Sequence, residues 1–200
     1  MESSLYSKDE LLRVKLLEFY SLKENLEILL PIILQKTRLS LRSLDWFVTN
    51  YCKKYNISYP LVKDNETISF SPFKRYKLQL KAYSKKFCDP FCRRERVIFD
   101  YKNNLILDFK SNIKMGHKDY IVTTIGQLNF FRFAITDKII NFAIEHINEI
   151  ENDMNSTLKT REIEKKVNFM EVKSIKRKEL SVPGNKSIHI TRISAVIKFV

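Results

Sequence analysis

The sequence predicts an α+β fold, and three patterns support that prediction. Apolar residues recur at helical spacing in the first quarter of the chain, behind an S-x-x-E capping box at Ser7. Two β-branched and aromatic runs, 97–101 and 105–109, flank an asparagine-containing turn and predict a β-hairpin. Isoleucines then recur at period 3.6 over 139–150. We therefore expect an N-terminal helical bundle, a central β-hairpin, a long Ile-rich helix or helical hairpin, and a C-terminal strand that pairs with the hairpin.

The chain has the size and composition of one compact domain. It has 200 residues, of which 44% are hydrophobic, and only three are glycine and five proline, so long flexible linkers are not encoded. The pattern changes near residue 56. We expect a helical region over residues 1–56 and a basic α+β region over 57–200, packed together as one domain.

Capping residues predict the N-terminal helices. Ser7 opens the first helix, Asn25 caps a short second helix over 26–36, and Ser40 caps a third over 41–55. The only tryptophan, Trp46, lies in the third helix, where a core or helix-contact role is commoner than ligand stacking.

Strands and one ambiguous segment follow. Residues 57–62 predict an edge or irregular strand, a turn follows at 64–65, and 67–70 form a short strand. Over residues 75–86, apolar side chains fit both a helix and a period-two strand. We prefer the helix because its set of apolar positions is longer.

Helices dominate the prediction after the hairpin. A brief strand at 120–122 leads into a second capping box, Thr124-x-x-Gln127, and a helix that breaks near residues 136–137. Helical periodicity then continues over 139–154. The charged segment 155–178 is interpreted as a mobile segment or an exposed helix, and 188–199 as the terminal strand.

The strongest functional indication is charge. The chain carries a formal net charge of +13. Residues 74–96 hold nine Lys or Arg against two acids, which is +7 of that total, with aromatic residues between the cations. Such a block predicts a nucleic-acid surface, because cations bind phosphates and exposed aromatic rings stack on bases. The predicted contacts are Lys74, Arg75, Lys81, Lys85, Lys86, Arg93, Arg94 and Arg96.

The same residues also fit interpretations without a ligand, as core aromatics and solvated surface cations. Tyr76, Tyr83, Phe87 and Phe91 fit core positions as well as stacking positions, and exposed cations are often only solvated. On the helix that begins at Thr124, Gln127, Asn129 and Arg132 either present polar groups to an anion or form the polar face of a packed helix.

A second function class is a structural or scaffold protein that binds an acidic protein partner or a second copy of itself. The Ile-rich helix and the acidic stretch 145–153 provide surfaces for such docking. A metal-dependent nuclease or zinc module is the weakest alternative. Asp100 and Asp108 lie on opposite strands of the hairpin, and Cys88-x-x-x-Cys92 has no second ligand pair to complete a zinc site.

Catalysis, cofactors and a membrane location are not predicted. The chain lacks the phosphate-loop, dinucleotide, nucleophile-elbow and zinc-protease motifs, so we expect neither an enzyme nor a cofactor. Residues 1–9 show no signal-peptide core, and the longest apolar run, 28–34, is far shorter than the about 20 residues of a bilayer span. Three cysteines are expected to be reduced thiols in a cytosolic or nuclear protein.

Four stretches resemble an uncharacterised protein family of giant nucleocytoplasmic large DNA viruses. They are LRSLDWFVTNYCKKYNI (41–57), QLKAYSKKFCDPFCRRERV (79–97), TTIGQLNFFRFAI (123–135) and KRKELSVPGNKSIHITRISAVIKF (176–199). The resemblance implies a viral source and a location in the host cytoplasm, at the viral factory, or in the virion. It brings no activity and therefore no catalytic residues.

Overall fold

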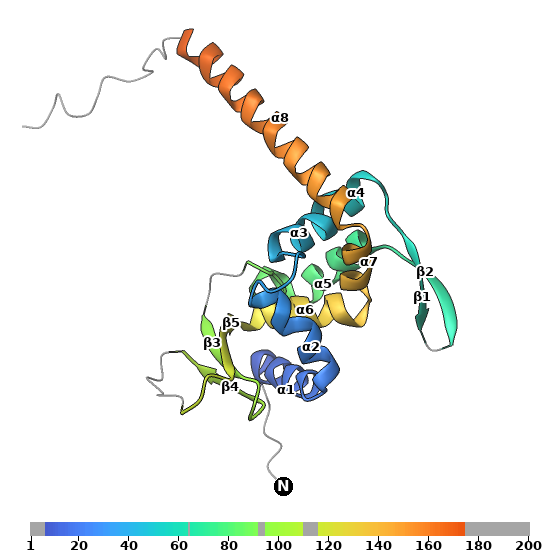
Figure 1. Cartoon of the computed structure of the whole chain (residues 1–200), viewed down its shortest axis with the longest axis vertical. Helices are drawn as coiled ribbons and strands as arrows, with labels where there is room; N and C mark the ends of the chain where they lie inside the picture. The colour runs from blue at the N-terminus through green and yellow to red at the C-terminus, as the bar shows by residue number, and fades with distance from the viewer. Residues whose placement is uncertain (1–6, 64, 92–94, 110–115, 175–200) are drawn as a thin grey trace, which may run out of the picture. The chain divides into compact units, whose positions relative to one another are not determined.

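A computed structural model describes residues 7–63, 65–91, 95–109 and 116–174, with side chains as far as residue 164. The chain divides into two compact units, Met1–Thr157 and Leu158–Val200. Together the elements make the predicted α+β fold (Figure 1). The helices are α1 Lys8–Tyr20, α2 Lys23–Ile33, α3 Leu41–Trp46, η1 Phe47–Tyr51, α4 Cys52–Lys54, α5 Pro72–Phe87, α6 Ile125–Thr136, α7 Ile139–Glu145 and α8 Ile147–Ser174. The strands are β1 Tyr59–Lys63, β2 Glu66–Phe70, β3 Arg96–Asp100, β4 Leu105–Asp108 and β5 Tyr120–Thr124.

The predicted helix caps are confirmed at three of four positions. Ser7 and Glu10 form the reciprocal capping box, while Ser40 and Thr124 each accept a hydrogen bond from the third backbone N–H of their helix. The Asn25 cap is wrong. Helix α2 begins earlier, at Lys23, and the Asn25 side chain instead donates to the Phe19 carbonyl.

The described strands form two small antiparallel sheets. In the first unit β1 and β2 pair with each other, and β4-β3-β5 is a three-stranded sheet. The predicted 97–109 hairpin is confirmed, with Val97 opposite Asp108 and Asp100 opposite Leu105. Strand β5 pairs with the other edge of β3. The predicted C-terminal strand, 188–199, lies outside the described residues.

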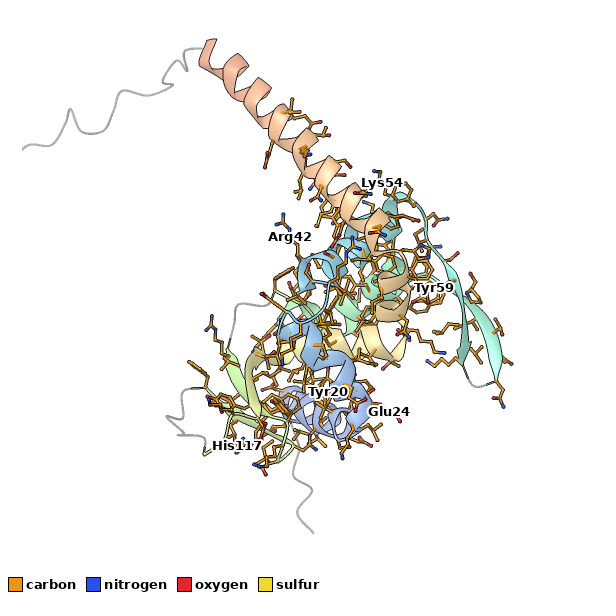
Figure 2. All side chains as sticks on the ribbon, viewed as in Figure 1. Tyr20, Glu24, Arg42, Lys54, Tyr59 and His117 are labelled. Atoms are coloured by element: carbon orange, nitrogen blue, oxygen red, sulfur yellow. The ribbon has the colours of Figure 1, made fainter. Side chains whose placement is uncertain are left out.

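Helix α6 occupies the centre of the first unit. Figure 1 shows it among α1, α2, α5 and α7, all of which contact it. Phe130 and Phe131 are fully buried, and the Phe130 ring meets Tyr76 of α5 edge to face at 5.7 Å. From α1, the buried Tyr20 hydroxyl donates to the Leu128 carbonyl at 2.7 Å (Tyr20 is labelled in Figure 2).

The Ile-rich segment is a series of helices separated by short breaks. Lys138 has a left-handed backbone (φ 53°) between α6 and α7, close to the predicted break. A second break, at His146, separates α7 from α8. The sequence predicted a long Ile-rich helix or a helical hairpin here, and the structure has helices over this segment with a break at His146 that the periodicity did not predict. The charged segment forms a helix as far as Ser174, and residues 159–164 of it are exposed.

Within the described ranges, no helix combines the length and the apolar character that crossing a bilayer requires.

Candidate nucleic-acid interface and cleft

Helix α5 carries most of the described cations of the basic block, and it is a helix as preferred from the sequence. Tyr76, on its inner side, is buried against Phe130 and Phe133 and so belongs to the core. Tyr76 is therefore not available to stack on a nucleic-acid base. Phe91, beyond the helix, is 47% exposed.

The outer side of α5 carries a row of lysines. Lys74, Lys77 and Lys81 follow one another at i, i+3 and i+7, a spacing that places them on one helix face, and all three are exposed. Lys53, from α4, joins them, because its ammonium and that of Lys77 both lie over the Phe73 ring, at 5.9 and 5.7 Å. We call Lys53, Lys74, Lys77 and Lys81 the lysine patch. Among the described residues, none of the four forms an ion pair with a carboxylate.

Arg75 faces away from this patch. With Gln79 and Tyr83, at i+4 and i+8, it lines a cleft of about 580 Å³. Helices α1 and α6, strand β1 and the residues that flank α2 and α6 provide the rest of the lining: Lys15, Glu18, Phe19, Leu22, Lys63, Arg132, Phe133, Thr136 and Asp137. The predicted contacts Lys74 and Arg75, although adjacent in sequence, therefore lie on different faces of α5.

The other predicted contacts lie beyond a break in α5. Ser84 has φ 61° and ψ 171°, which interrupts the helix before Lys85 and Lys86. Both lysines are exposed, and Lys86 lies over the Phe87 ring at 5.0 Å. Arg96 is exposed at the start of β3, while Arg93 and Arg94 lie outside the described residues.

The loop that leads toward Arg93 is anchored to the start of α6. The Gln127 side-chain amide donates to the Pro90 carbonyl, and the Asn129 amide donates to the Phe87 carbonyl at 2.7 Å. The backbone N–H of Asp89 donates to the Gly126 carbonyl. Of the two alternatives for Gln127 and Asn129, these hydrogen bonds fit the packed helix, in which both side chains have structural roles.

Arg132, in contrast, lines the cleft. Its Nε donates to Asn129 Oδ1 at 3.1 Å, and one Nη donates to the Tyr83 hydroxyl at 3.3 Å. Both acceptors are neutral, and no described carboxylate forms an ion pair with this half-buried guanidinium. Arg75, by comparison, lies 3.7 Å from the buried Asp137 carboxylate. Burial raises the pKa of Asp137, while Arg75 and Lys63 oppose that rise.

Asp100 and Asp108, the two hairpin acids considered as metal ligands, each interact with a different partner. The buried Asp100 accepts hydrogen bonds from the backbone and side chain of Asn103, and its Oδ2 lies 3.2 Å from His117 Nε2. Asp108 pairs with Arg13 of α1 at 3.0 Å. Within the described part of the chain, no group of three or more His, Cys, Asp or Glu side chains could hold a metal ion.

The described cysteines are not poised for chemistry. Cys52 and Cys88 are buried free thiols, and burial raises the pKa of both, so they carry little of the reactive thiolate at neutral pH. Cys92, the other half of the Cys-x-x-x-Cys pair, lies outside the described residues.

One carboxylate has a strongly perturbed pKa. Burial, together with the charge of the nearby Asp89, raises the pKa of Asp45 in α3 to about 6. A carboxyl group whose folded pKa exceeds its unfolded value adds stability at low pH, and that stability is lost as the pH rises through 6.

We expect Asp45→Asn to raise the free energy of unfolding at pH 8 by about 1–2 kcal/mol, because it removes a charge that the folded state destabilises. The gain should shrink at pH 5, where the native carboxyl group is largely protonated. Urea titrations followed by Trp46 fluorescence at both pH values measure it, with the exposed Glu27→Gln as control. An equal gain at both pH values would contradict the assignment.

Comparison with known proteins places the chain in a family. A family described as being of unknown function, DUF7197, matches residues 4–196. The chain is 40% identical over 140 residues to "Uncharacterized protein L507" of Acanthamoeba polyphaga mimivirus, an alignment that covers 70% of this chain and 50% of that protein. The chain thus spans about half the length of this curated relative. No solved structure matches the chain.

These matches confirm the resemblance to an uncharacterised protein family of giant DNA viruses. Because the family match spans nearly the whole sequence, the chain belongs to the DUF7197 family of unknown function.

Proposed function

We propose that this chain is a nucleic-acid-binding accessory or virion-associated protein of a large DNA virus, acting in the host cytoplasm or the virion without catalysis. The observation that carries the proposal is the lysine patch. Lys53, Lys74, Lys77 and Lys81 are exposed, and no described carboxylate neutralises them. Phosphate groups of a strand are the natural partners of such a row, because each contact releases a condensed counterion.

The geometry of the patch suits a phosphate backbone more than base recognition. Residues at i, i+3 and i+7 follow the axis of a helix, which rises 1.5 Å per residue, so Lys74 and Lys81 are about 10 Å apart along it. Neighbouring phosphates of a strand lie several ångströms apart, and the flexible lysine stems adapt to that spacing. We therefore expect binding that depends strongly on salt and weakly on sequence.

The proposal is tested by reversing the patch. We expect Lys74→Glu/Lys77→Glu/Lys81→Glu to weaken binding of a labelled oligonucleotide, single-stranded or duplex, at least tenfold at about 50 mM salt. The slope of log affinity against log salt should fall by about two, since each lost phosphate contact removes roughly 0.7–0.9. Fluorescence anisotropy across a salt series measures both quantities.

The matched control makes the same charge change elsewhere. Lys23→Glu/Lys36→Glu/Lys118→Glu reverses three exposed lysines that lie outside the patch. Equal weakening by both variants would mean that only net charge matters. Absence of binding by the unaltered chain at about 50 mM salt would disprove the proposal. Reversal of Arg93 and Arg94 to Glu tests the remaining predicted contacts in the same assay.

The scaffold alternative has less support. The acids proposed to dock a partner are largely engaged within the chain. Glu149 accepts from the Tyr51 hydroxyl, Glu151 pairs with Arg38, and Asp153 is buried among three donors. Light scattering that found a stable oligomer, together with a failed oligonucleotide titration, would favour the scaffold role instead.

A further inference from the structure

The cleft lined by α1, α5 and α6 carries an excess of positive charge. Lys15, Lys63, Arg75 and Arg132 face it against two acids, Glu18 and Asp137, which leaves a formal charge of +2. Asp137 is only 5% exposed and is already shared between Arg75 and Lys63. The other two cations of the cleft, Lys15 and Arg132, do not share the Asp137 carboxylate, and the Lys15 side chain is exposed.

Arg132 is held in place for an anion. Two of its five N–H donors bond to Asn129 and Tyr83, and the Asn129 that orients it is 1% exposed and fixed in turn by the Phe87 carbonyl. The remaining donors have no described acceptor. The guanidinium is half-buried and its neighbours are neutral, and its planar fork suits the oxygens of a phosphate.

The cleft also has an apolar wall and an amide. Phe19 is half-buried and Leu22 is 60% exposed, so both offer apolar surface to a ligand. Gln79 makes no hydrogen bond to any described residue, and its carboxamide can both donate and accept. A volume of about 580 Å³ lies within the roughly 300–1,000 Å³ typical of small-molecule sites.

We propose that this cleft binds a nucleotide, with its phosphate at Arg132 and Lys15 and its base against Phe19 and Leu22, within reach of Gln79. The ligand chemistry is a phosphate ester joined to a planar, hydrogen-bonding base. A free mononucleotide and the terminal nucleotide of a strand both supply it. The inference goes beyond the proposed function, because the cleft and the lysine patch lie on different faces of α5. Either proposal can therefore be disproved without the other.

Calorimetric titration of the full chain with ATP, adenosine and inorganic triphosphate tests the assignment. We expect ATP to bind, and adenosine and triphosphate each to bind at least tenfold more weakly, since each lacks half of the recognised groups. Oligonucleotides with and without a 5′-phosphate show whether the ligand is a free nucleotide or the end of a strand. A tenfold preference for the phosphorylated oligonucleotide would identify the strand terminus as the ligand. Equal binding of the two would identify the free nucleotide. No ATP binding at about 1 mM, or equal binding of triphosphate and ATP, would overturn the proposal.

Variants assign the binding to the cleft. Arg132→Ala and, separately, Lys15→Glu should each weaken ATP binding at least tenfold, while Arg42→Ala and Lys23→Glu, which alter exposed cations elsewhere, should leave it unchanged. Lys15 is exposed, so its variant remains informative if Arg132→Ala fails to fold. The lysine-patch triple variant should keep its ATP affinity. Unchanged binding in Lys15→Glu and in a folded Arg132→Ala would disprove the site.

Discussion

Replacing Phe130 with alanine should lower the free energy of unfolding by about 3–5 kcal/mol, the largest single loss that we expect in this chain. Phe130 is fully buried in α6 and contacts the rings of Tyr76, Phe131 and Phe133 at centroid distances of 5.7–6.2 Å. Truncation removes the transfer free energy of the ring and leaves a cavity among aromatic neighbours that cannot collapse to fill it.

The loss is measured by urea denaturation. Trp46, the only tryptophan, lies in α3 and reports on global unfolding from outside the altered cluster. Leu78→Ala, on α5, is the control, because Leu78 is 54% exposed and should change stability by no more than about 0.5 kcal/mol. A loss for Phe130→Ala below about 1.5 kcal/mol would mean that α6 is not the centre of the core.

Asp153→Ala should cost about 2–4 kcal/mol. The Asp153 carboxylate is 7% exposed on α8, where it accepts hydrogen bonds from the Trp46 indole at 2.9 Å, from the Tyr55 hydroxyl at 3.0 Å and from Lys54, which Figure 2 labels. These donors come from α3, from α4 and from the residue after it, so the substitution removes the hydrogen bonds that join the start of α8 to the N-terminal helices.

The pH dependence of stability gives a second test of the hydrogen bonds to Asp153. Burial favours a higher pKa for Asp153, but the hydrogen bonds from Lys54, Trp46 and Tyr55 outweigh it and hold that pKa below its usual value. A lowered folded pKa contributes stability that is present above about pH 4 and is lost as the pH falls through the folded value. The stability gap between the native chain and Asp153→Ala should therefore be full at pH 7 and narrow below pH 4.

Two controls bracket this prediction. Asp153→Asn keeps an oxygen that can accept from Trp46 and should lose about half as much as alanine. Glu151→Ala removes an ion pair with the exposed Arg38 and should cost no more than about 1 kcal/mol. An equal loss in the free energy of unfolding for Glu151→Ala and Asp153→Ala would mean that the charge of α8, and not the buried hydrogen bonds, causes the loss.

Features encoded by neighbouring residues could be predicted from the sequence. Ser7, Ser40 and Thr124 each cap the helix that begins at the next residue, and the 97–109 hairpin follows from its turn. The break at His146 was missed because the isoleucine pattern runs through it, and a single residue outside the helix scarcely disturbs that period.

The candidate sites were only partly predictable, for a physical reason. The cleft gathers residues 15, 63, 75 and 132, which come from four separate elements and share no local pattern. Arg75 was predicted as a contact and Arg132 as a possible one, but the composition of the block could not separate Arg75 from Lys74. That separation depends on the direction in which α5 packs, which the buried rings of Tyr76 and Phe130 determine.

The β1–β2 hairpin has a consequence for local opening. Its strands pair only with each other among the described strands, and within these two strands Leu61 and Phe70 are the only buried residues. Two contacts fasten its base: the Tyr59 hydroxyl donates to the Asp137 carbonyl, and the Tyr59 ring stacks on Phe142 at 4.8 Å. Amide protons of this hairpin should therefore exchange with solvent through sub-global fluctuations, sooner than those of α6. Because Lys63 belongs to both the hairpin and the cleft wall, an occupied cleft should slow that exchange.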